Sequence, residues 1–475
     1  MDTAHNNQDG QPLSPTFIGV ICGLFLAPTA LGFSAAPVAL STLAHHLHVS
    51  AGQSAWVLAA YTLTMAVMTA LSGRIADLRG LRTPLPLVTI ALAVGTAVCL
   101  IAPNLSTVII GRLIQGIGAG AASVIAFRLP ATRLAKPGDR GTALGTMGII
   151  VGLLSGAGAL LGGILTQDLS WRWALALPGL SILSVPAIAL MVPSVDTRHA
   201  NPLDIRGALL CTVAVAALTV LIQAHSTGLQ WPQAALAGLI MTATAMLLAR
   251  HQHQHPDGFI PRALSANPRF RLAAASGFTL FAGYLVMQFA APLLLIAHDP
   301  RLSTTDIGFI LLPAGLTSAA LSRTAGALIV HTGAWPIVLA LSAASTTGLL
   351  VAAAIGTSPV AIVIALAACV SGFSAGQVTL MAALPAIVET DIQGVATGVF
   401  QLIFITGGSI GAAAIGALST LVDLRLGVAL LAVLPAVGFA CAALAARSTP
   451  TRSSTADNPK ANERIRPTAL EPRRG

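Results

Sequence analysis

The chain has 475 residues, of which 55% are hydrophobic and only 9% are charged, and its formal net charge is +9. Soluble globular proteins carry roughly a quarter charged residues, so this composition excludes water as the main solvent of the chain. The basic residues lie in short loops and near the C-terminus rather than on one face, and aromatic residues make up only 4%, so we expect no nucleic-acid partner.

Apolar segments long enough to cross a bilayer follow one another along almost the whole chain. A helix needs roughly 20 apolar residues to cross about 30 Å of hydrocarbon, and about fourteen segments approach this length. A membrane β-barrel would show short alternating segments instead, and a helix satisfies its own backbone hydrogen bonds in lipid. We predict an all-α integral membrane fold of about fourteen transmembrane helices, near residues 16–40, 53–71, 84–101, 106–129, 142–165, 173–192, 207–224, 233–249, 272–296, 307–330, 336–355, 360–388, 395–421 and 426–446.

Arginine and lysine residues gather in every second loop between these segments. Cations are retained on the cytoplasmic side during insertion, so we predict a multi-pass protein of the cell inner (plasma) membrane with both termini cytoplasmic. Residues 1–15 form a polar cytoplasmic segment, and the first apolar segment is expected to be a retained span rather than a cleaved signal. Residues 447–475 are polar and contain Pro and Ser, and we expect a disordered cytoplasmic tail there.

The loop after the second segment reads Gly-Arg-Ile-Ala-Asp-Leu-Arg-Gly-Leu-Arg from Gly73 to Arg82. It resembles the loop signature of the major facilitator superfamily. Glycine lets two helices approach closely, and an aspartate offers negative charge to a neighbouring helix N-terminus. The resemblance implies a conformational lock, formed by Gly73, Asp77, Arg79, Gly80 and Arg82.

The fourth and fifth segments carry two further motifs. The fourth contains Arg112 and Gln115 in a stretch similar to the superfamily's Arg-x-x-Gln-Gly segment. A guanidinium within a span is costly unless it faces a polar interior. The fifth resembles the glycine motif of the superfamily's antiporters, although alanine replaces its proline, and clustered glycines allow close helix packing. We expect these residues to serve the transport cycle: Arg112, Gln115, Gly158, Gly162 and Gly163.

Three shorter stretches, 171–173, 203–207 and 302–308, resemble the fourteen-span drug/proton antiporter branch, which includes tetracycline and multidrug efflux proteins. The resemblance implies a major facilitator fold with two six-helix halves and two extra spans between them. The expected boundaries are 16–192 for the N-terminal half, 193–271 for the extra spans with their loops, and 272–446 for the C-terminal half. A monomer is expected to be functional.

Proton coupling needs a titratable group, and its place is not obvious in this sequence. The aspartate that many fourteen-span exporters carry in the first span is Gly32 here, and no Asp or Glu lies near the middle of a predicted span. Asp306 at the mouth of a span is one candidate. His45 and His46 are others, because a histidine titrates near physiological pH.

No cofactor and no metal are expected. His251, His253 and His255 alternate in a polar loop, which would allow metal binding, but an interfacial polar linker is favoured because no Cys or carboxylate set accompanies them. Nothing resembles a nucleotide-binding loop, so we do not expect ATP-driven transport.

The implied fold places a substrate cavity between the halves. Polar and aromatic side chains within spans would line it, because an amide facing lipid is left unpaired; the candidates are Tyr61, Phe281, Tyr284, Gln288, Gln377, Gln401 and Phe404. Without a buried carboxylate, a neutral, zwitterionic or metal-chelated amphiphile fits at least as well as a cation.

The favoured function is therefore secondary transport rather than catalysis: a proton antiporter that exports amphiphilic drugs or a related natural product by alternating access, and so confers antibiotic resistance. Two alternatives remain open, since a fold does not fix function. The chain could import or facilitate the passage of a metabolite, or act as a membrane sensor that no longer transports.

Overall fold

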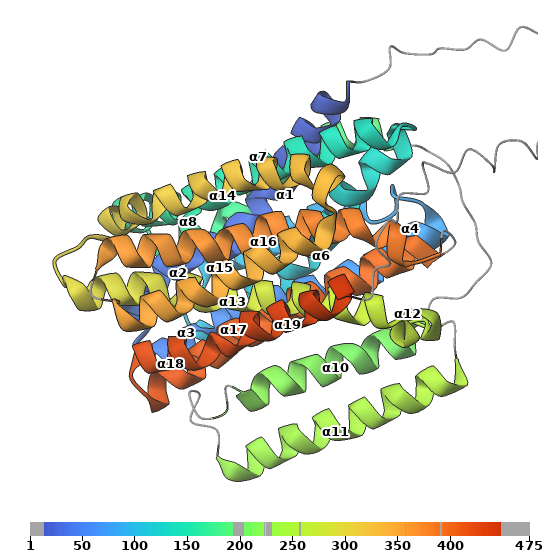
Figure 1. Cartoon of the computed structure of the whole chain (residues 1–475). Helices are drawn as coiled ribbons and strands as arrows, with labels where there is room; N and C mark the ends of the chain where they lie inside the picture. The colour runs from blue at the N-terminus through green and yellow to red at the C-terminus, as the bar shows by residue number, and fades with distance from the viewer. Residues whose placement is uncertain are drawn as a thin grey trace, which may run out of the picture.

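A computed structural model describes residues 14–192, 204–222, 224, 230–255, 258–356, 358–389 and 392–447. All regular structure in these residues is helical, and Figure 1 shows the helices lying side by side in one elongated bundle. The prediction of an all-α membrane fold is confirmed, since most helices are apolar over a length that crosses a bilayer.

The first group of helices precedes residue 192. Two of its apolar segments consist of more than one helix. α1 and α2 meet at Ala35. α8, η1 and α9 follow one another without a loop and together form one apolar helical segment, Trp171–Met191. The bounds are α1 Pro15–Ser34, α2 Ala36–Leu47, α3 Ala51–Ser54, α4 Trp56–Arg79, α5 Leu85–Ile101, α6 Leu105–Arg133, α7 Pro137–Asp168, α8 Trp171–Ala176, η1 Leu177–Ser184 and α9 Val185–Met191.

Two helices, α10 Ile205–Ile222 and α11 Trp231–Gln254, lie as a pair beside the main bundle (Figure 1). α10 packs against α11 on one side and against α4 and α17 on the other. Only 6% of the apolar window of α11 is buried inside the protein, so its surface is that of a helix surrounded by lipid.

The second group of helices follows the pair. Its last crossing, Leu424–Arg447, is made of two helices. The bounds are α12 Arg262–Ala266, α13 Pro268–His298, α14 Thr304–Thr332, α15 Ala334–Ala354, α16 Pro359–Ile387, α17 Gln393–Leu421, α18 Leu424–Leu431 and α19 Val433–Arg447.

Twelve helices in the described residues are long and apolar enough to cross a membrane. The other two of the fourteen predicted segments form shorter apolar helices, Leu85–Ile101 and Arg206–Ile222. Twelve spans are therefore supported by length and composition, and a total of fourteen stays a prediction.

The two groups meet along two helix pairs, α7 with α14 and α4 with α17. Glycines face each other in both contacts. A Cβ added to Gly156 of α7 would collide with Gly315 of α14, and one added to Gly73 of α4 would lie 3.6 Å from the Cα of Gly398 in α17. The term basic end is used below for the end of the bundle where α4 and α6 finish at Arg79 and Arg133; the other is the opposite end.

Candidate functional site

A central cavity lies between the two groups of helices. Its volume is about 30 Å³, whereas sites that hold drug-sized ligands measure roughly 300–1,000 Å³. A ligand of that size would therefore need the helices to move apart. The lining comes from seven long helices: Leu26, Thr29, Ala30 and Phe33 of α1, Met65 of α4, Ser123 and Phe127 of α6, Val151 of α7, Phe281 of α13, and, from α16 and α17, Phe373, Gln377, Gln401, Phe404 and Ile405.

Aromatic rings form one wall of the central cavity. Phe281 stacks on Phe373 and on Phe404, with ring centroids 4.8 and 5.1 Å apart. Phe33, from the first group, meets the rings of Phe281 and Phe373 edge-on, at 5.6 Å in each case. Such contacts contribute roughly 0.5–1.5 kcal/mol each beyond area burial. The cluster thus joins the two groups and offers flat apolar faces at the cavity.

Two glutamine side chains supply most of the polar character of this lining. Gln377 Nε2 donates a hydrogen bond to Gln401 Oε1 at 2.9 Å. Gln401 is only 2% exposed, and its own Nε2 is buried without a partner. An unsatisfied buried polar group costs about 1–3 kcal/mol. The Gln401 amide is therefore a free hydrogen-bonding position beside aromatic rings.

Of the seven predicted substrate residues, the structure places four in the lining of the central cavity: Phe281, Gln377, Gln401 and Phe404. The other three do not line this cavity. Tyr284 stacks on Phe373 at 4.8 Å, and Gln288 Nε2 donates to the carbonyl oxygen of Ser34 at 2.9 Å, which ties α13 to α1. Tyr61 is occupied elsewhere, against Arg112.

Arg112 is fully buried in α6 and is held by neighbours on two other helices. Its Nε donates to the carbonyl oxygen of Val57 at 3.0 Å and its Nη1 to Gln115 Oε1 at 3.0 Å, while its Nη2 donates to the carbonyl oxygen of Gly32. The guanidinium carbon lies 4.0 Å from the centroid of the Tyr61 ring, a cation–π contact. Among the described side chains, no other charged residue is buried to this degree.

Gln115 and Tyr61 are fixed by bonds of their own. Gln115 Nε2 donates to Thr96 Oγ1 at 3.1 Å and to the carbonyl oxygen of Leu175 at 3.0 Å. The Tyr61 hydroxyl donates to the carbonyl oxygen of Thr29 at 2.7 Å. The charge of Arg112 therefore meets carbonyl dipoles, an amide and a ring face, and its described contacts include no carboxylate.

The absence of a side chain at Gly32 allows the Tyr61 ring to lie against the guanidinium of Arg112. A Cβ on Gly32 would be 2.7 Å from Tyr61 Cζ, closer than any van der Waals contact. The glycine leaves the space that the ring fills. In this chain the position of the exporters' aspartate is thus occupied by an aromatic face that covers the guanidinium of Arg112.

The three glycines expected in the transport cycle lie where α7 touches other backbones. An added Cβ would collide with the Ser34 hydroxyl at Gly158, with the Ala35 carbonyl oxygen at Gly162, and with the Thr304 carbonyl oxygen at Gly163. α7 thus receives the junction of α1 and α2 on one side and the start of α14 on the other.

The expected conformational lock lies at the basic end. Gly73 and Arg74 of α4 face α17 across a cavity of about 10 Å³, which we call the basic-end cavity; its other lining residues are Ala70, Phe259, Val395, Gly398 and Val399. Arg79 is exposed in the last turn of α4, and Gly80 ends the helix with φ of 83°. Arg82 is exposed in the following loop, and the side chain of Asp77 lies outside the described residues.

The proton-coupling candidates lie near the opposite end, apart from the central cavity and from Arg112. Asp306 is exposed and caps α14: its Oδ2 accepts from Ser303 N at 3.0 Å and from Ser303 Oγ at 2.7 Å. His45 and His46 are exposed in the last turn of α2, with ring centroids 6.4 Å apart. Asp306 already has a structural role in this arrangement.

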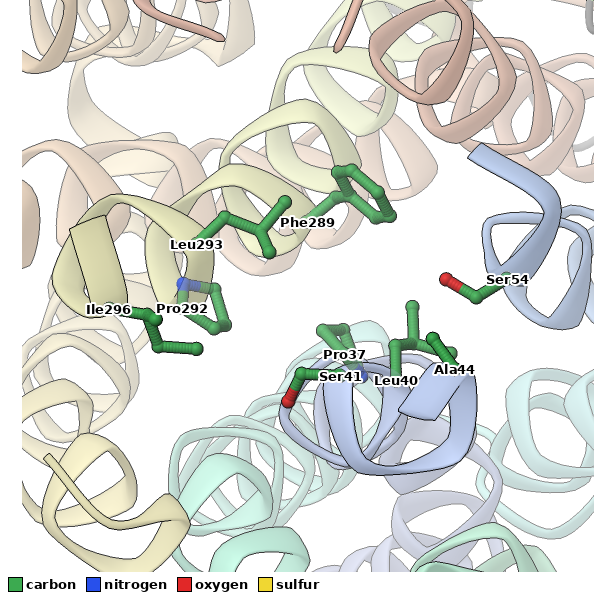
Figure 2. A pocket seen from close by; sticks show the side chains of 9 residues that line it. All are labelled: Pro37, Leu40, Ser41, Ala44, Ser54, Phe289, Pro292, Leu293 and Ile296. Carbon is green, nitrogen blue, oxygen red and sulfur yellow. The ribbon is translucent and has the colours of Figure 1, made fainter. Parts of the chain in front are cut away.

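A third cavity, of about 30 Å³, lies between the groups at the opposite end. Figure 2 shows the α2 residues below it and the α13 residues above it. The lining is almost entirely apolar: Pro37, Leu40, Ser41, Ala44, Ser54, Phe289, Pro292, Leu293 and Ile296. Side chains therefore separate α2 from α13 at this cavity, whereas Gly73 and Gly398 bring the backbones of α4 and α17 close together at the basic end.

The histidine-rich stretch is engaged in a contact that the sequence did not reveal. His251 Nε2 lies 2.8 Å from Asp204 Oδ1, and the His255 ring stacks on His251 at 4.4 Å, while His253 is exposed. In the described part of the chain, no group of three or more His, Cys, Asp or Glu could hold a metal. This stretch thus joins the end of α11 to the start of α10.

Sequence reasoning also missed Phe33 and Phe373, the two rings that complete the aromatic wall. Phe373 lies one helical turn before Gln377, and Phe33 follows Gly32 directly. The spacing of Phe373 and Gln377 was a usable signal. Phe33 offered none, because phenylalanine faces lipid as readily as it faces a cavity.

Comparison with known proteins identifies the fold. The family model of the Major Facilitator Superfamily matches residues 20–404. The chain is 30% identical over 338 residues to the uncharacterized MFS-type transporter Rv1877 of Mycobacterium tuberculosis, covering 69% of this chain and 48% of that protein. It is 29% identical over 291 residues to a lincomycin resistance protein of Streptomyces lincolnensis, covering 59% of this chain and 58% of that protein. The matches span about half the length of these relatives.

Among solved structures, the human organic anion transporter MFSD10 superposes with a TM-score of 0.63, covering 90% of this chain and 98% of that one at 16% identity. A likeness at this identity supports the fold alone. The family model covers well over half of the chain and therefore shows the family to which it belongs. The chain belongs to the major facilitator superfamily.

Proposed function

We propose that this protein exports small, amphiphilic, aromatic compounds of the kind that includes antibiotics, by alternating access and in exchange for protons. The observation that carries the proposal is the central cavity, where phenylalanine rings from both helix groups lie beside Gln401, whose Nε2 donor has no hydrogen-bond partner. The similarity to a lincomycin resistance protein supports an antibiotic-like substrate.

The lining favours substrates that carry no net positive charge. It contains no Asp or Glu, and a desolvated cation without a carboxylate would lose its hydration without a matching gain. Flat apolar groups would stack on Phe281 and Phe373, and a polar substituent would take the hydrogen bond that Gln401 offers. Neutral and zwitterionic molecules therefore fit this lining best.

The proposed coupling uses protons, and its carrier is to be sought near the opposite end. Asp306 is engaged as a helix cap, whereas His45 and His46 are exposed in the last turn of α2. The buried cluster of Arg112, Gln115 and Tyr61 is proposed to set the orientation of α1, α4 and α6 during the cycle.

We further propose fourteen spans, with α10 and α11 crossing as a pair between a half at 16–192 and a half at 272–446. Trp231, at the opposite-end start of α11, is 81% exposed, as an aromatic anchor at the headgroup level would be. The basic end then lies in the cytoplasm with both termini, and Asp77, Arg79 and Arg82 form the lock at that face.

The proposal is tested in cells that express the protein and are loaded with a neutral fluorescent aromatic dye. Energised cells should lose dye faster than cells that carry the empty vector, and a protonophore should abolish the difference. A cationic dye of similar size serves as the comparison and should be exported more slowly. Faster dye entry instead of faster loss would show an importer or facilitator, and equal rates would show that the dye is not transported.

A further inference from the structure

The segment between α11 and α12 places one aromatic ring in the contact between the two halves. Phe259 is 7% exposed and lines the basic-end cavity. The other lining residues come from α4, in the first group, and from α17, in the second. Phe259 belongs to neither helix, so it is a third element at the place where the two groups close on each other.

The backbone of Phe259 is held by Asp204, the residue before α10. Asp204 Oδ2 accepts a hydrogen bond from Phe259 N at 2.8 Å, and Oδ1 accepts from Gly207 N at 2.9 Å and lies 2.8 Å from His251 Nε2. One carboxylate thus connects the start of α10, the end of α11 and the segment that carries Phe259.

The fit around this carboxylate leaves no room for larger residues. A Cβ on Gly258 would lie 2.7 Å from Asp204 Oδ2, and one on Gly207 would lie 2.9 Å from Phe259 Cβ. The position of Phe259 is therefore set by the extra helix pair and not by the helices that it touches.

We infer that Phe259 is a positioning residue of the transport cycle: a wedge, held by Asp204, that favours the state in which α4 and α17 are closed at the basic end. The inference rests on the alternating-access cycle proposed above, in which these helices separate at that end. Separation would remove the ring from at least one of its two neighbours and expose it to water, which is unfavourable for an apolar group.

Arg74, which also lines the basic-end cavity, favours the open state instead. Arg74 lines the basic-end cavity, and its Nε is buried without a hydrogen-bond partner. Opening would let water solvate that atom. Phe259 thus lowers the free energy of the closed state relative to the open state, and Arg74 raises it. The two contributions oppose each other, which keeps the two states close enough in free energy to interconvert.

The test measures the distance between spin labels on purified full-length protein in nanodiscs. Labels at Arg79 and Glu389 report on the end of α4 and on the approach to α17, since both residues are exposed at the basic end. The background carries Cys441→Ala, because the other four cysteines are buried. Phe259→Ala should raise the ratio of open to closed molecules by about tenfold, the order expected for exposing one large apolar side chain.

The neighbouring residue provides the matched control. Ile260 packs against the core but does not line the basic-end cavity, so Ile260→Ala removes apolar volume from the same segment and should leave the distance distribution unchanged. Phe259→Leu, which keeps part of the volume, should give an intermediate shift and covers the case in which Phe259→Ala folds poorly. Equal distributions for the parent, Phe259→Ala and Phe259→Leu would overturn the inference.

A double-mutant cycle separates positioning from general stabilisation. Asp204→Ala alone should shift the distribution in the same direction as Phe259→Ala, because it releases the segment. In the Phe259→Ala background it should have little further effect, since no ring remains to be positioned. A full additional shift in that background would show that Asp204 acts on the helices themselves and would overturn its assigned role.

The outcome is independent of what the protein carries. A protein that exports no dye but shows these shifts would contradict the proposed function and leave the wedge in place. Normal dye export together with unchanged distances would contradict the wedge alone.

Discussion

The guanidinium carbon of Arg112 lies 4.0 Å from the centre of the Tyr61 ring, and the hydroxyl of that ring donates to the carbonyl oxygen of Thr29 at 2.7 Å. The cation of α6 is thereby linked through α4 to α1. A movement of any of these helices would change the contacts of the other two, so we expect Arg112, whose described contacts include no carboxylate, to act through the relative positions of α1, α4 and α6.

Arg112→Lys tests this linkage. A lysine keeps the charge but has one nitrogen in place of three held in a fixed plane, so it cannot reproduce the geometry of the bonds to Val57, Gln115 and Gly32. We expect efflux to fall by about tenfold or more at normal protein levels in the membrane. The measurement is the initial rate of dye loss, normalised to protein detected in the membrane fraction. A rate equal to that of the parent would restrict Arg112 to a role in charge and topology.

Gly32→Ala should destabilise the protein, because the new Cβ would lie 2.7 Å from Tyr61 Cζ. Overpacking of this kind costs about 1–3 kcal/mol and should lower the Tm of the purified protein. Gly238→Ala is the matched control, since Gly238 is also helical and has nothing within 4 Å of an added Cβ; its Tm should stay equal or rise slightly. Adding Tyr61→Leu to Gly32→Ala should recover part of the loss. Without such recovery, the clash would not be the cause.

Gln401→Leu should change which substrates are exported. The substitution removes the free amide and leaves the Gln377 Nε2 donor without its acceptor. For a dye with a carbonyl group we expect KM to rise by about fivefold to a hundredfold, the range for one lost buried hydrogen bond. A purely apolar dye of similar size should be affected less. The comparison of KM for the two dyes is the measurement, and equal changes would assign Gln401 to structure.

Asp204→Asn should alter the rate of transport but not its dependence on pH between about 5.5 and 8. Burial tends to raise the pKa of Asp204, but hydrogen bonds from Gly207, Phe259 and His251 outweigh burial and hold the pKa below its usual value. A carboxylate with a lowered pKa stabilises the fold above its unfolded pKa of about 3.9, and this contribution is lost only as the pH falls through the lowered value. A changed pH profile of efflux in the variant would assign a proton to this group.

Replacement of both His45 and His46 by glutamine tests the remaining coupling candidates. If either residue carries the proton, efflux should lose its dependence on an imposed pH gradient, while dye binding is kept. The measurement is dye loss from vesicles with and without a pH jump. An unchanged response would remove both residues from the set of coupling candidates.

The helices were predictable because hydrophobicity alone selects them. The segment expected at 395–421 is α17, Gln393–Leu421, and that at 106–129 lies within α6, Leu105–Arg133. Helix length in lipid is set by bilayer thickness, which the sequence reports directly. The number of membrane crossings was harder to predict than the helices themselves, because α5 has 17 residues and α10 has 18. Both lengths are near the lower limit for a span.

The site was only partly predictable. Phe281, Tyr284 and Gln288 share a helix face, yet only Phe281 lines the central cavity. Tyr284 stacks on Phe373, and Gln288 donates to the carbonyl oxygen of Ser34 in α1. The contact of Phe259 with Asp204 joins residues 55 positions apart. Spacing along one helix does not reveal neighbours on another, so contacts of this kind required the structure.

The two facing glycines of α7 and α14 have a mechanical consequence. At Gly156 and Gly315 no side chain stands between the two backbones, and an added Cβ on either would strike the other helix. One half can therefore tilt against the other about this point without any rotamer change at the crossing. We expect a tilt about the crossing of α7 and α14 to move the two ends of the bundle in opposite directions, so that the groups separate at one end as they approach at the other.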